Sequence, residues 1–186
     1  MPIPRRQFCG TLGATFAAAT ASLFAANNEP EQLRVIAYNI YKCTGWPSDR
    51  PLARQAVAKA QMAKRLAMEL ALFEPDIVNF SESPAEELTQ EVAKLLGMNY
   101  VRFPSRGNWP GALLSNVKIT ESQNAPMKGE RPKELFTRHW GRATIRLPGG
   151  DPLIVHSAHL HPTADPTTRL KEVRTMIASM KPDLDA

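Results

Sequence analysis

Cysteine is scarce in this sequence of 186 residues, which contains only Cys9 and Cys43. Cys9 lies in an N-terminal segment that we expect to be removed, so Cys43 alone would remain in the mature chain. An internal disulfide is then impossible, and a small fold held together by disulfides is excluded. The packing of an apolar core must stabilise the protein instead.

Three other patterns are missing. No uncharged apolar run reaches the ~20 residues that a helix needs to cross a bilayer, and no segment repeats at the period of a solenoid. The net charge is +5, of which Arg5 and Arg6 supply two, and the remaining basic residues are scattered along the chain. The sequence therefore contains no recognisable nucleic-acid-binding patch, although its mild positive charge is compatible with a phosphate-bearing substrate.

The composition is that of a soluble globular domain. Apolar residues make up 43% of the chain and charged residues 22%, which are ordinary values. The length corresponds to about one domain. We therefore expect one domain over residues 33–186, which is long enough to bury a core.

The first 26 residues are typical of a targeting signal. Arg5 and Arg6 precede Phe8, and an uncharged, alanine-rich run extends over Thr11–Ala26. A charged start, an apolar stretch and small residues at its end are the parts of a signal peptide. The paired arginines resemble a twin-arginine (Tat) export signal. We therefore expect residues 1–26 to direct export, and the mature protein to be periplasmic or extracellular.

The end of this signal allows two cleavage sites, after Ala21 or after Ala26, and both stay open. The alternative to a signal is an N-terminal membrane anchor. The apolar run of 16 residues is shorter than the ~20 that a transmembrane helix needs, which favours a signal.

Six segments have the pattern of β-strands. They are short and rich in apolar and β-branched residues, and the first, LRVIAYNI, is apolar enough to be buried on both faces. Pro148–Asp151 is a turn sequence that predicts a hairpin between the last two strands. The predicted strands are Leu33–Ile40, Asp76–Phe80, Tyr100–Phe103, Ala112–Asn116, Ala143–Leu147 and Leu153–His159.

Three segments are predicted to be helices. Ala53–Phe73 has apolar residues at helical spacing and predicts one helix of about five turns. Ser83–Glu86 is a capping-box sequence that predicts a helix ending at Gly97, and Asp165-Pro166 predicts the start of a final helix. The inward face of the final helix is expected to carry Leu170, Val173, Ile177 and Met180. This order of strands and helices predicts an α/β layered domain.

Asn39, Glu82 and His159 stand where predicted strands end. Side chains at strand ends are where α/β proteins usually carry their sites. Each residue also has a structural explanation: Asn39 as a turn former, Glu82 as a solvated carboxylate before a helix, and His159 as a surface histidine. His156 and His161 lie near His159, so spacing alone leaves the choice of histidine open.

Four segments, in order, resemble motifs of the endonuclease/exonuclease/phosphatase superfamily, which includes deoxyribonuclease I and the neutral sphingomyelinases. LRVIAYNI resembles its opening strand, and EPDIVNFSE resembles the motif in which a strand leads to a metal-binding glutamate. GNWPGALLSNVKI resembles a glycine-containing strand motif, and PLIVHSAHLHP followed by Arg169 resembles the histidine-leucine motif. The resemblance covers Leu33 to about Met180.

The resemblance implies a four-layered α/β sandwich of the deoxyribonuclease I type and a Mg²⁺- or Mn²⁺-dependent phosphodiesterase or phosphatase. It implies that Glu82 binds the metal, since hard cations prefer carboxylate oxygens. Asn39 would bind a phosphate oxygen, or orient water or metal. His159 would contact the phosphoryl oxygen and stabilise its charge when protonated. The match to the histidine-leucine motif favours His159 over its two neighbours.

Two later motifs of the superfamily are absent from this sequence: a Gly-Asp-x-Asn strand end, which supplies a water-aligning aspartate, and a terminal Ser-Asp-His, which supplies the general base. We therefore expect a partial sandwich that lacks the C-terminal strands, with little hydrolytic activity. One explanation is a fragment of a longer gene. Another is a short, non-catalytic exported domain that binds phosphate or metal, and a third is an unrelated exported module.

The substrate class is open between a nucleic acid, a phospholipid head group and a small phosphoester. Trp46 and Trp109 lie in loops beside the expected site. They could stack on a base or sugar, contact lipid, or cover the edge of the core. No stable protein partner is evident from the sequence.

Overall fold

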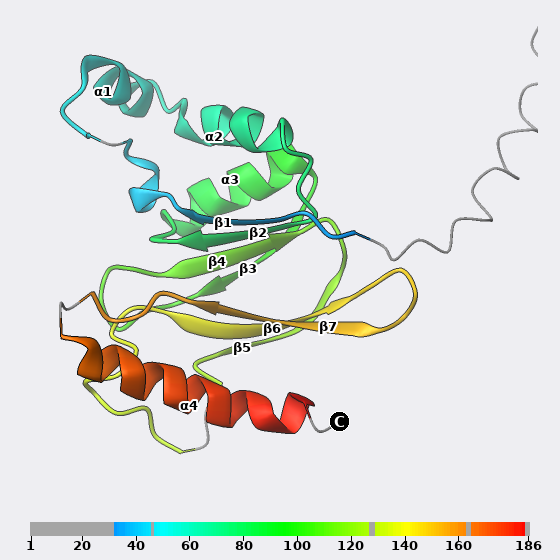
Figure 1. Ribbon diagram of the computed structural model, residues 1–186. Helices are drawn as coiled ribbons and strands as arrows, with labels where there is room; N and C mark the ends of the chain where they lie inside the picture. The colour runs from blue at the N-terminus through cyan, green and yellow to red at the C-terminus, as the bar shows by residue number, and fades with distance from the viewer. Residues whose placement is uncertain (1–31, 46, 127–128, 163–164, 185–186) are drawn as a thin grey trace, which may run out of the picture. The chain divides into compact units, whose positions relative to one another are not determined.

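The structure is a computed structural model that describes residues 32–45, 47–126, 129–162 and 165–184. The expected targeting signal at residues 1–26 and the indole of Trp46 lie outside the described residues. The unit that begins at Leu33 contains two β-sheets that lie face to face between helices, as Figure 1 shows.

The first sheet consists of four strands, β1 (Val35–Asn39), β2 (Ile77–Ser81), β3 (Asn99–Phe103) and β4 (Gly111–Ser115). Their order across the sheet is β1-β2-β4-β3. β1 and β2 are parallel, whereas β4 is antiparallel to both of its neighbours. Because β1 and β2 run in the same direction, their carboxyl ends lie side by side, with Asn39 opposite Ser81.

The second sheet is an antiparallel meander of β5 (Ile119–Asn124), β6 (Trp140–Arg146) and β7 (Pro152–Ala158). β6 and β7 form the hairpin that the turn at Pro148–Asp151 predicts. β5 was not among the predicted strands, because most of its residues are polar and all but Ile119 are exposed. It is recognisable only through its pairing with β6.

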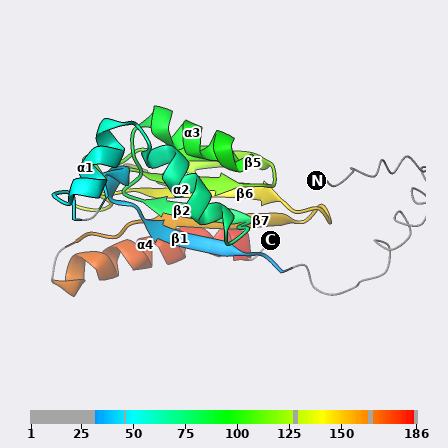
Figure 2. The ribbon, with the colours of Figure 1, turned by 90° about the horizontal axis from the view of Figure 1, so that it is seen from above.

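Helices cover the outer face of each sheet (Figures 1 and 2). The four-stranded sheet is covered by α2 (Met62–Ala71) and α3 (Glu86–Leu96), with α1 (Pro51–Ala58) before them, and the three-stranded sheet is covered by α4 (Pro166–Leu184). The predicted layered α/β arrangement is therefore confirmed, with four layers. Among the described residues, no helix combines the length and apolar character needed to cross a membrane.

Strand β2 divides its side chains between two cores. Val78 and Phe80 pack toward the helices, in a cluster that includes Leu70 of α2 and Val92 of α3. Ile77 packs on the other face, in the core between the sheets. That core also contains Phe103, Leu113, Ala143 and Ile145. A strand covered on both faces must be almost wholly apolar, which explains why this segment could be recognised in the sequence.

The prediction that the first strand is buried on both faces is wrong. β1 is an edge strand that pairs with β2, and Val35 and Tyr38 are 59% and 39% exposed. Its apolar sequence resembles that of β2, so the pattern could not distinguish an edge from a central position.

The single long helix predicted over Ala53–Phe73 is divided into α1 and α2. Ala60 adopts a left-handed conformation with φ of +50°, and the amide of Gln61 donates to the carbonyl of Ala56. Of the apolar stripe that the spacing predicts, Ala60 is exposed, whereas the other four residues are buried: Ala56, Ala63, Ala67 and Leu70.

The capping box predicted at Ser83–Glu86 does not form. α3 has Ala85 at its N-cap without a side-chain cap, because the Ser83 hydroxyl pairs with Thr89 Oγ1 at 3.1 Å instead. The predicted stop is confirmed, with Gly97 in the left-handed conformation at φ of +68°.

Helix α4 starts where predicted but turns a different face inward. Asp165 caps its first turn by accepting from the Thr167 amide at 3.0 Å. Of the four residues expected to face inward, Leu170, Val173 and Ile177 are exposed and Met180 is half-buried. The face toward the sheet carries polar residues together with Met176, which packs against the core around Trp140.

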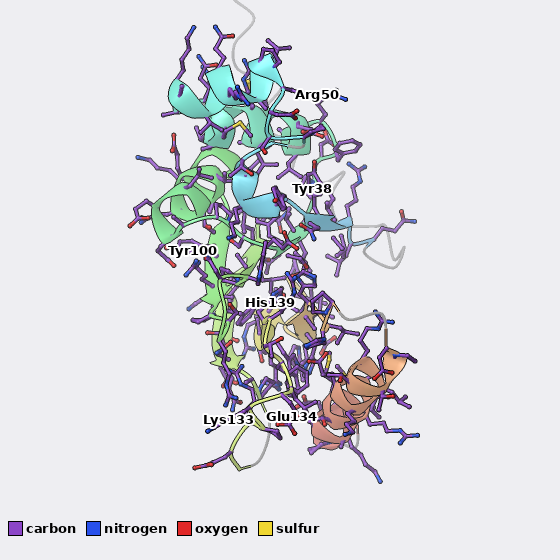
Figure 3. All side chains as sticks on the ribbon, turned by 90° about the vertical axis from the view of Figure 1, so that its left-hand side faces the viewer. Tyr38, Arg50, Tyr100, Lys133, Glu134 and His139 are labelled. Carbon is purple, nitrogen blue, oxygen red and sulfur yellow. The ribbon has the colours of Figure 1, made fainter. Side chains whose placement is uncertain are left out.

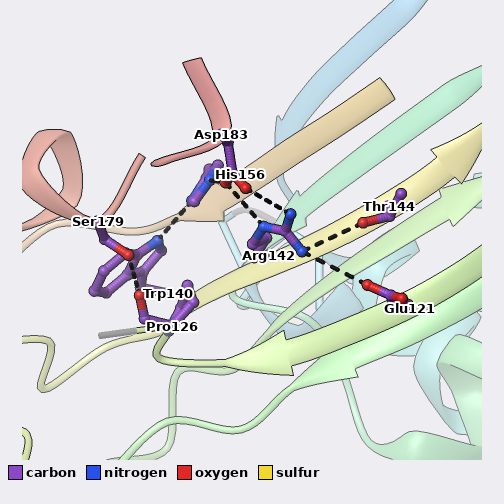
Figure 4. Close-up of polar contacts among 8 residues, drawn as sticks. All are labelled: Glu121, Pro126, Trp140, Arg142, Thr144, His156, Ser179 and Asp183. Carbon is purple, nitrogen blue, oxygen red and sulfur yellow. Dashed lines mark hydrogen bonds and ion pairs between the residues drawn. The ribbon is translucent and has the colours of Figure 1, made fainter. Parts of the chain in front are cut away.

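The polar contacts of the inward face explain this orientation. The fully buried carboxylate of Glu172 accepts from the amides of Phe136 and His161 at 2.6 and 2.7 Å. Near the end of the helix, Asp183 pairs with Arg142 of β6 (Figure 4). These polar partners, which lie far away in the sequence, outweigh the apolar periodicity.

Candidate active site

Glu82 follows the last residue of β2 and has a strained backbone. Its φ is +54°, a conformation that costs free energy for a residue other than glycine. Two neighbouring loops hold it there: its carbonyl accepts from the Lys42 amide at 2.7 Å, and the next amide, of Ser83, donates to Pro110 at 2.9 Å. Strain of this kind is often found at functional sites.

The carboxylate of Glu82 is buried and only partly paired. Its Oε1 accepts from Arg138 Nη1 at 3.1 Å and lies 4.0 Å from His159 Nε2. Its Oε2 is buried and has no hydrogen-bond partner among the described residues. A buried carboxylate oxygen without a partner is costly, so this atom is suited to a ligand that brings positive charge.

His159 is the histidine of the three candidates that reaches Glu82. It follows β7, and its amide donates to the carbonyl of His139 at 3.0 Å, which places its ring beside the carboxylate. Burial lowers the pKa of His159, the charge of Arg138 lowers it further, and Glu82 opposes both. The lowered pKa favours the neutral imidazole, and additional negative charge nearby would favour the protonated form.

The two other histidines face different surroundings. His156 accepts from the Trp140 indole at 3.2 Å and lies 3.9 Å from Asp183, beneath α4 (Figure 4). His161 lines an open cavity beside Arg138. Of the three histidines, His159 is the one with a recorded contact to Glu82, and its role as a site residue stays a prediction.

Arg138 was not predicted as a site residue from the sequence. It lies in the segment before β6, and no spacing or motif distinguishes it from the other scattered arginines. Its guanidinium lies 4.4 Å from the centroid of the Trp109 ring, and the Lys42 ammonium lies 4.2 Å from the same centroid. Trp109 thereby holds two cations against one ring, an arrangement favoured by cation–π attraction, and one of them, Arg138, also bonds Glu82.

His139 was also not predicted as a site residue from the sequence. It supports the site because its carbonyl accepts from the amide of His159. It is fully buried in the middle of the molecule (Figure 3), where its Nε2 lies 3.0 Å from Ser157 Oγ. Burial lowers its pKa to about 4, with a smaller contribution from His159. It packs against Gly111 of β4 so closely that a Cβ there would lie 2.1 Å from Nε2. Only glycine fits at that position.

Asn39 ends β1 beside Glu82 in the sheet, but its side chain is engaged elsewhere. Its Oδ1 accepts from the amide of Tyr41 at 3.1 Å, as a turn-forming asparagine does. Asn39 also lines a cavity of about 160 Å³ next to Met62 and Arg65 of α2. The structure thus brings Glu82 and His159 into contact and leaves Asn39 at the adjacent strand end.

A larger open cavity adjoins the cluster. It has a volume of about 380 Å³ and is lined by Arg106, Trp109, Arg138 and His161, among others. Two of these residues, Trp109 and Arg138, also belong to the group around Glu82. A group the size of a phosphate could therefore approach Arg138 from this side.

This geometry is compatible with a divalent cation if water and substrate phosphate supply its other ligands. No group of three or more histidine, cysteine, aspartate or glutamate residues that could hold a metal occurs within the described part of the chain. Mg²⁺, however, is commonly held by one or two carboxylates, with water and substrate phosphate completing its shell. The free Oε2 of Glu82 fits that kind of site.

The fold is a two-sheet α/β sandwich with a buried acidic residue at the carboxyl end of a central strand. No protein-family model matches the sequence, and no curated protein is similar to it. Solved structures do match the fold, and among them are proteins of the endonuclease/exonuclease/phosphatase family, whose fold this chain shares.

Among the similar structures is TDP2 from D. rerio in complex with a single-strand DNA product, with a TM-score of 0.57 and 22% identity over 80% of this chain. An endonuclease/exonuclease/phosphatase family protein from Bacteroides thetaiotaomicron has a TM-score of 0.57 and 15% identity over 82% of this chain. The chain spans 54% and 59% of the lengths of these two structures.

Proposed function

We propose that this chain carries the metal-binding half of a phosphoester hydrolase site, with Glu82 as the ligand of Mg²⁺ or Mn²⁺. The observation that carries the proposal is the buried Glu82 carboxylate, which has one oxygen without a partner and lies at the end of β2 in a phosphoesterase fold. The bound cation would neutralise charge on the phosphate and orient it for attack.

His159 would then contact a phosphoryl oxygen. Burial and the charge of Arg138 lower its pKa, which favours the neutral imidazole. An incoming phosphate adds negative charge and favours the protonated imidazole, which can donate to the developing oxyanion. Asn39 would donate to a phosphate oxygen, or orient water, through its Nδ2 group, since its Oδ1 accepts from the Tyr41 amide.

Positive charge around the cluster supports an anionic substrate. Lys42 and Arg138 lie over Trp109, and Arg106 lines the adjoining cavity. The substrate class that we propose is a phosphoester in the broad sense. D. rerio TDP2, with its bound single-strand DNA product, supports nucleic acid as the first compound class to test.

The proposal is tested with a panel of phosphodiesters and phosphomonoesters, including single-stranded DNA, assayed with and without Mg²⁺. Because the sequence lacks the Gly-Asp-x-Asn and Ser-Asp-His motifs, we expect little hydrolysis by this chain alone. Once a segment that carries both motifs is added, we expect hydrolysis that depends on the metal and is lost in Glu82→Gln. Glu87→Gln is the matched control, because Glu87 is exposed in the first turn of α3, and it should retain activity.

The alternative is a non-catalytic exported domain that binds phosphate or metal. It predicts that metal binding depends on Glu82 while no member of the panel is hydrolysed. Hydrolysis that Glu82→Gln leaves unchanged would contradict both functions of this site.

We also propose that the chain is exported through the twin-arginine pathway. The support is the Arg5-Arg6 pair before the uncharged run of Thr11–Ala26. Replacing both arginines by lysine should leave the uncleaved precursor in the cytoplasm, as detected by fractionation and immunoblotting. Unchanged export of the double variant would contradict the proposal.

A further inference from the structure

Two arginine–carboxylate pairs in this chain differ in geometry. Arg142 and Asp183 form a two-pronged pair, with Nε to Oδ2 at 3.0 Å and Nη2 to Oδ1 at 2.8 Å (Figure 4). Parallel hydrogen bonds of this kind are the strongest arrangement for an arginine and a carboxylate. This pair fastens the end of α4 to β6, so its role is structural.

The pair between Arg138 and Glu82 is incomplete by comparison. It consists of one hydrogen bond, from Nη1 to Oε1 at 3.1 Å. Arg138 Nε and Glu82 Oε2 are both buried, and neither has a hydrogen-bond partner among the described residues. Both side chains are largely buried, at 13% and 10% exposure, so each unpaired atom is costly.

A buried ion pair with unused hydrogen-bonding atoms can be replaced by a more favourable interaction of the same carboxylate. A divalent cation brings twice the charge of a guanidinium and can use the carboxylate oxygen that Arg138 leaves free. Since both cations would stand within a few Å of the same carboxylate, they repel each other. The binding of one must therefore weaken the binding of the other.

Arg138 also has a second attractive position. Its guanidinium already lies 4.4 Å from the Trp109 ring centroid, and Arg138 and Trp109 both line the 380 Å³ cavity. A guanidinium released from Glu82 can remain against the indole while it turns toward the cavity. There it would meet the phosphate of a substrate, for which arginine is well suited.

We propose that Arg138 is a built-in counter-ion that occupies Glu82 until a divalent cation displaces it, and that the displaced guanidinium then binds the substrate phosphate. The proposal rests on the proposed function of Glu82 as the metal ligand. It adds that the metal-free site is closed by an internal cation and that metal binding prepares the phosphate site.

The test is direct Mn²⁺ binding to the full 186-residue chain, measured by electron paramagnetic resonance of the free ion. Arg138→Met removes the charge and keeps the length of the side chain. Because a like charge near the cation is lost, we expect the Mn²⁺ dissociation constant to fall by about tenfold or more. Arg138→Lys keeps the charge, and its dissociation constant should remain within about threefold of the wild type.

Lys42→Met is the matched control. Lys42 lies over the same ring, and it reaches Glu82 through its backbone amide, which the substitution leaves in place. It should tighten Mn²⁺ binding much less than Arg138→Met. In a second titration, inorganic phosphate with saturating Mn²⁺ should bind Arg138→Met at least tenfold more weakly than the wild type.

The sign of the change in Mn²⁺ affinity separates the explanations. Weaker or unchanged Mn²⁺ binding by a folded Arg138→Met variant, as judged by circular dichroism, would show that Arg138 supports Glu82 instead of competing with the metal. Absence of Mn²⁺ binding from both the wild type and Arg138→Met would contradict the metal-binding function of Glu82 itself. Tighter binding together with unchanged phosphate affinity would overturn the second half of the proposal.

Discussion

The Ser157 hydroxyl of β7 donates a hydrogen bond of 2.5 Å to Asn79 Oδ1 of β2 and so joins the two sheets. Ser157 Oγ also lies 3.0 Å from Nε2 of His139, whose ring centroid is 6.3 Å from that of His159. This chain of polar contacts ends at His139, whose ring is next to that of His159 in the candidate site. It fixes the distance between the strand that leads to Glu82 and the strand that leads to His159.

Ser157→Ala should destabilise the protein by about 1–3 kcal/mol, because it leaves polar atoms of Asn79 and His139 buried without their partner. Chemical denaturation measures the change in the free energy of unfolding. Ser122→Ala is the control, since Ser122 is an exposed residue of β5 and its loss should have little effect. Equal stabilities of the two variants would show that the chain across the sheets contributes nothing.

The buried His139 predicts a loss of stability in mild acid. Its pKa is lowered to about 4 in the folded protein, whereas in the unfolded chain it is about 6.5. Between these values the unfolded chain binds more protons, so stability falls as the pH falls from 6.5 to 4, by about 3 kcal/mol in total. The contribution is complete above pH 6.5.

His139→Gln should remove this part of the pH dependence while it leaves the contributions of His156 and His159 in place. The free energy of unfolding of both proteins is measured from pH 7.5 to 4.5. The slope should be smaller in the variant. Parallel curves would mean that His139 titrates normally in the folded state.

The strands that could be predicted are those whose own residues indicate whether they are buried. β2 and β4 are covered on both faces, and each has three apolar residues among its five. β5 has polar, exposed residues and is defined by its partner β6. The inward face of α4 was predicted wrongly for a related reason: its polar contacts, such as Glu172 to the Phe136 amide, depend on residues far away in the sequence.

The break between α1 and α2 could not be predicted, because no glycine or proline marks it. Ala60 has a φ of +50°, where an L-residue is strained and glycine is not. Ala60→Gly should therefore stabilise the protein by about 0.5–1 kcal/mol. Ala58→Gly, within α1, should destabilise it by a similar amount. Thermal unfolding of the two variants should shift in opposite directions, and shifts of the same sign would contradict the assigned break.

Asp183 holds the last turns of α4 through Arg142. Asp183→Asn removes a charge-assisted pair and should weaken this end of the helix by about 1–2 kcal/mol. Hydrogen exchange of the amides at 179–184 should become faster, with little change in α2. Asp151→Asn is the control, since Asp151 is exposed in the hairpin turn. Unchanged exchange at the end of α4 would show that the pair does not hold it.

The candidate site was predictable only in part. Glu82 and His159 could be found because they follow recognisable strands, and the structure brings them to 4.0 Å. Arg138 could not, because its position depends on the packing of Trp109 from a distant loop. Asn39 accepts from the Tyr41 amide, which is the turn-forming role that the sequence also allowed. Its position beside Glu82 follows from the parallel pairing of β1 and β2.

The central claim is that Glu82 binds a divalent cation, and the most direct test is the position of Mn²⁺ in a crystal soaked with the ion. Anomalous scattering locates manganese independently of the protein atoms. The account predicts a peak about 2.0–2.3 Å from a carboxylate oxygen of Glu82, with the Arg138 guanidinium moved away from Oε1. A peak elsewhere, or no peak at Glu82 at saturating Mn²⁺, would contradict the account.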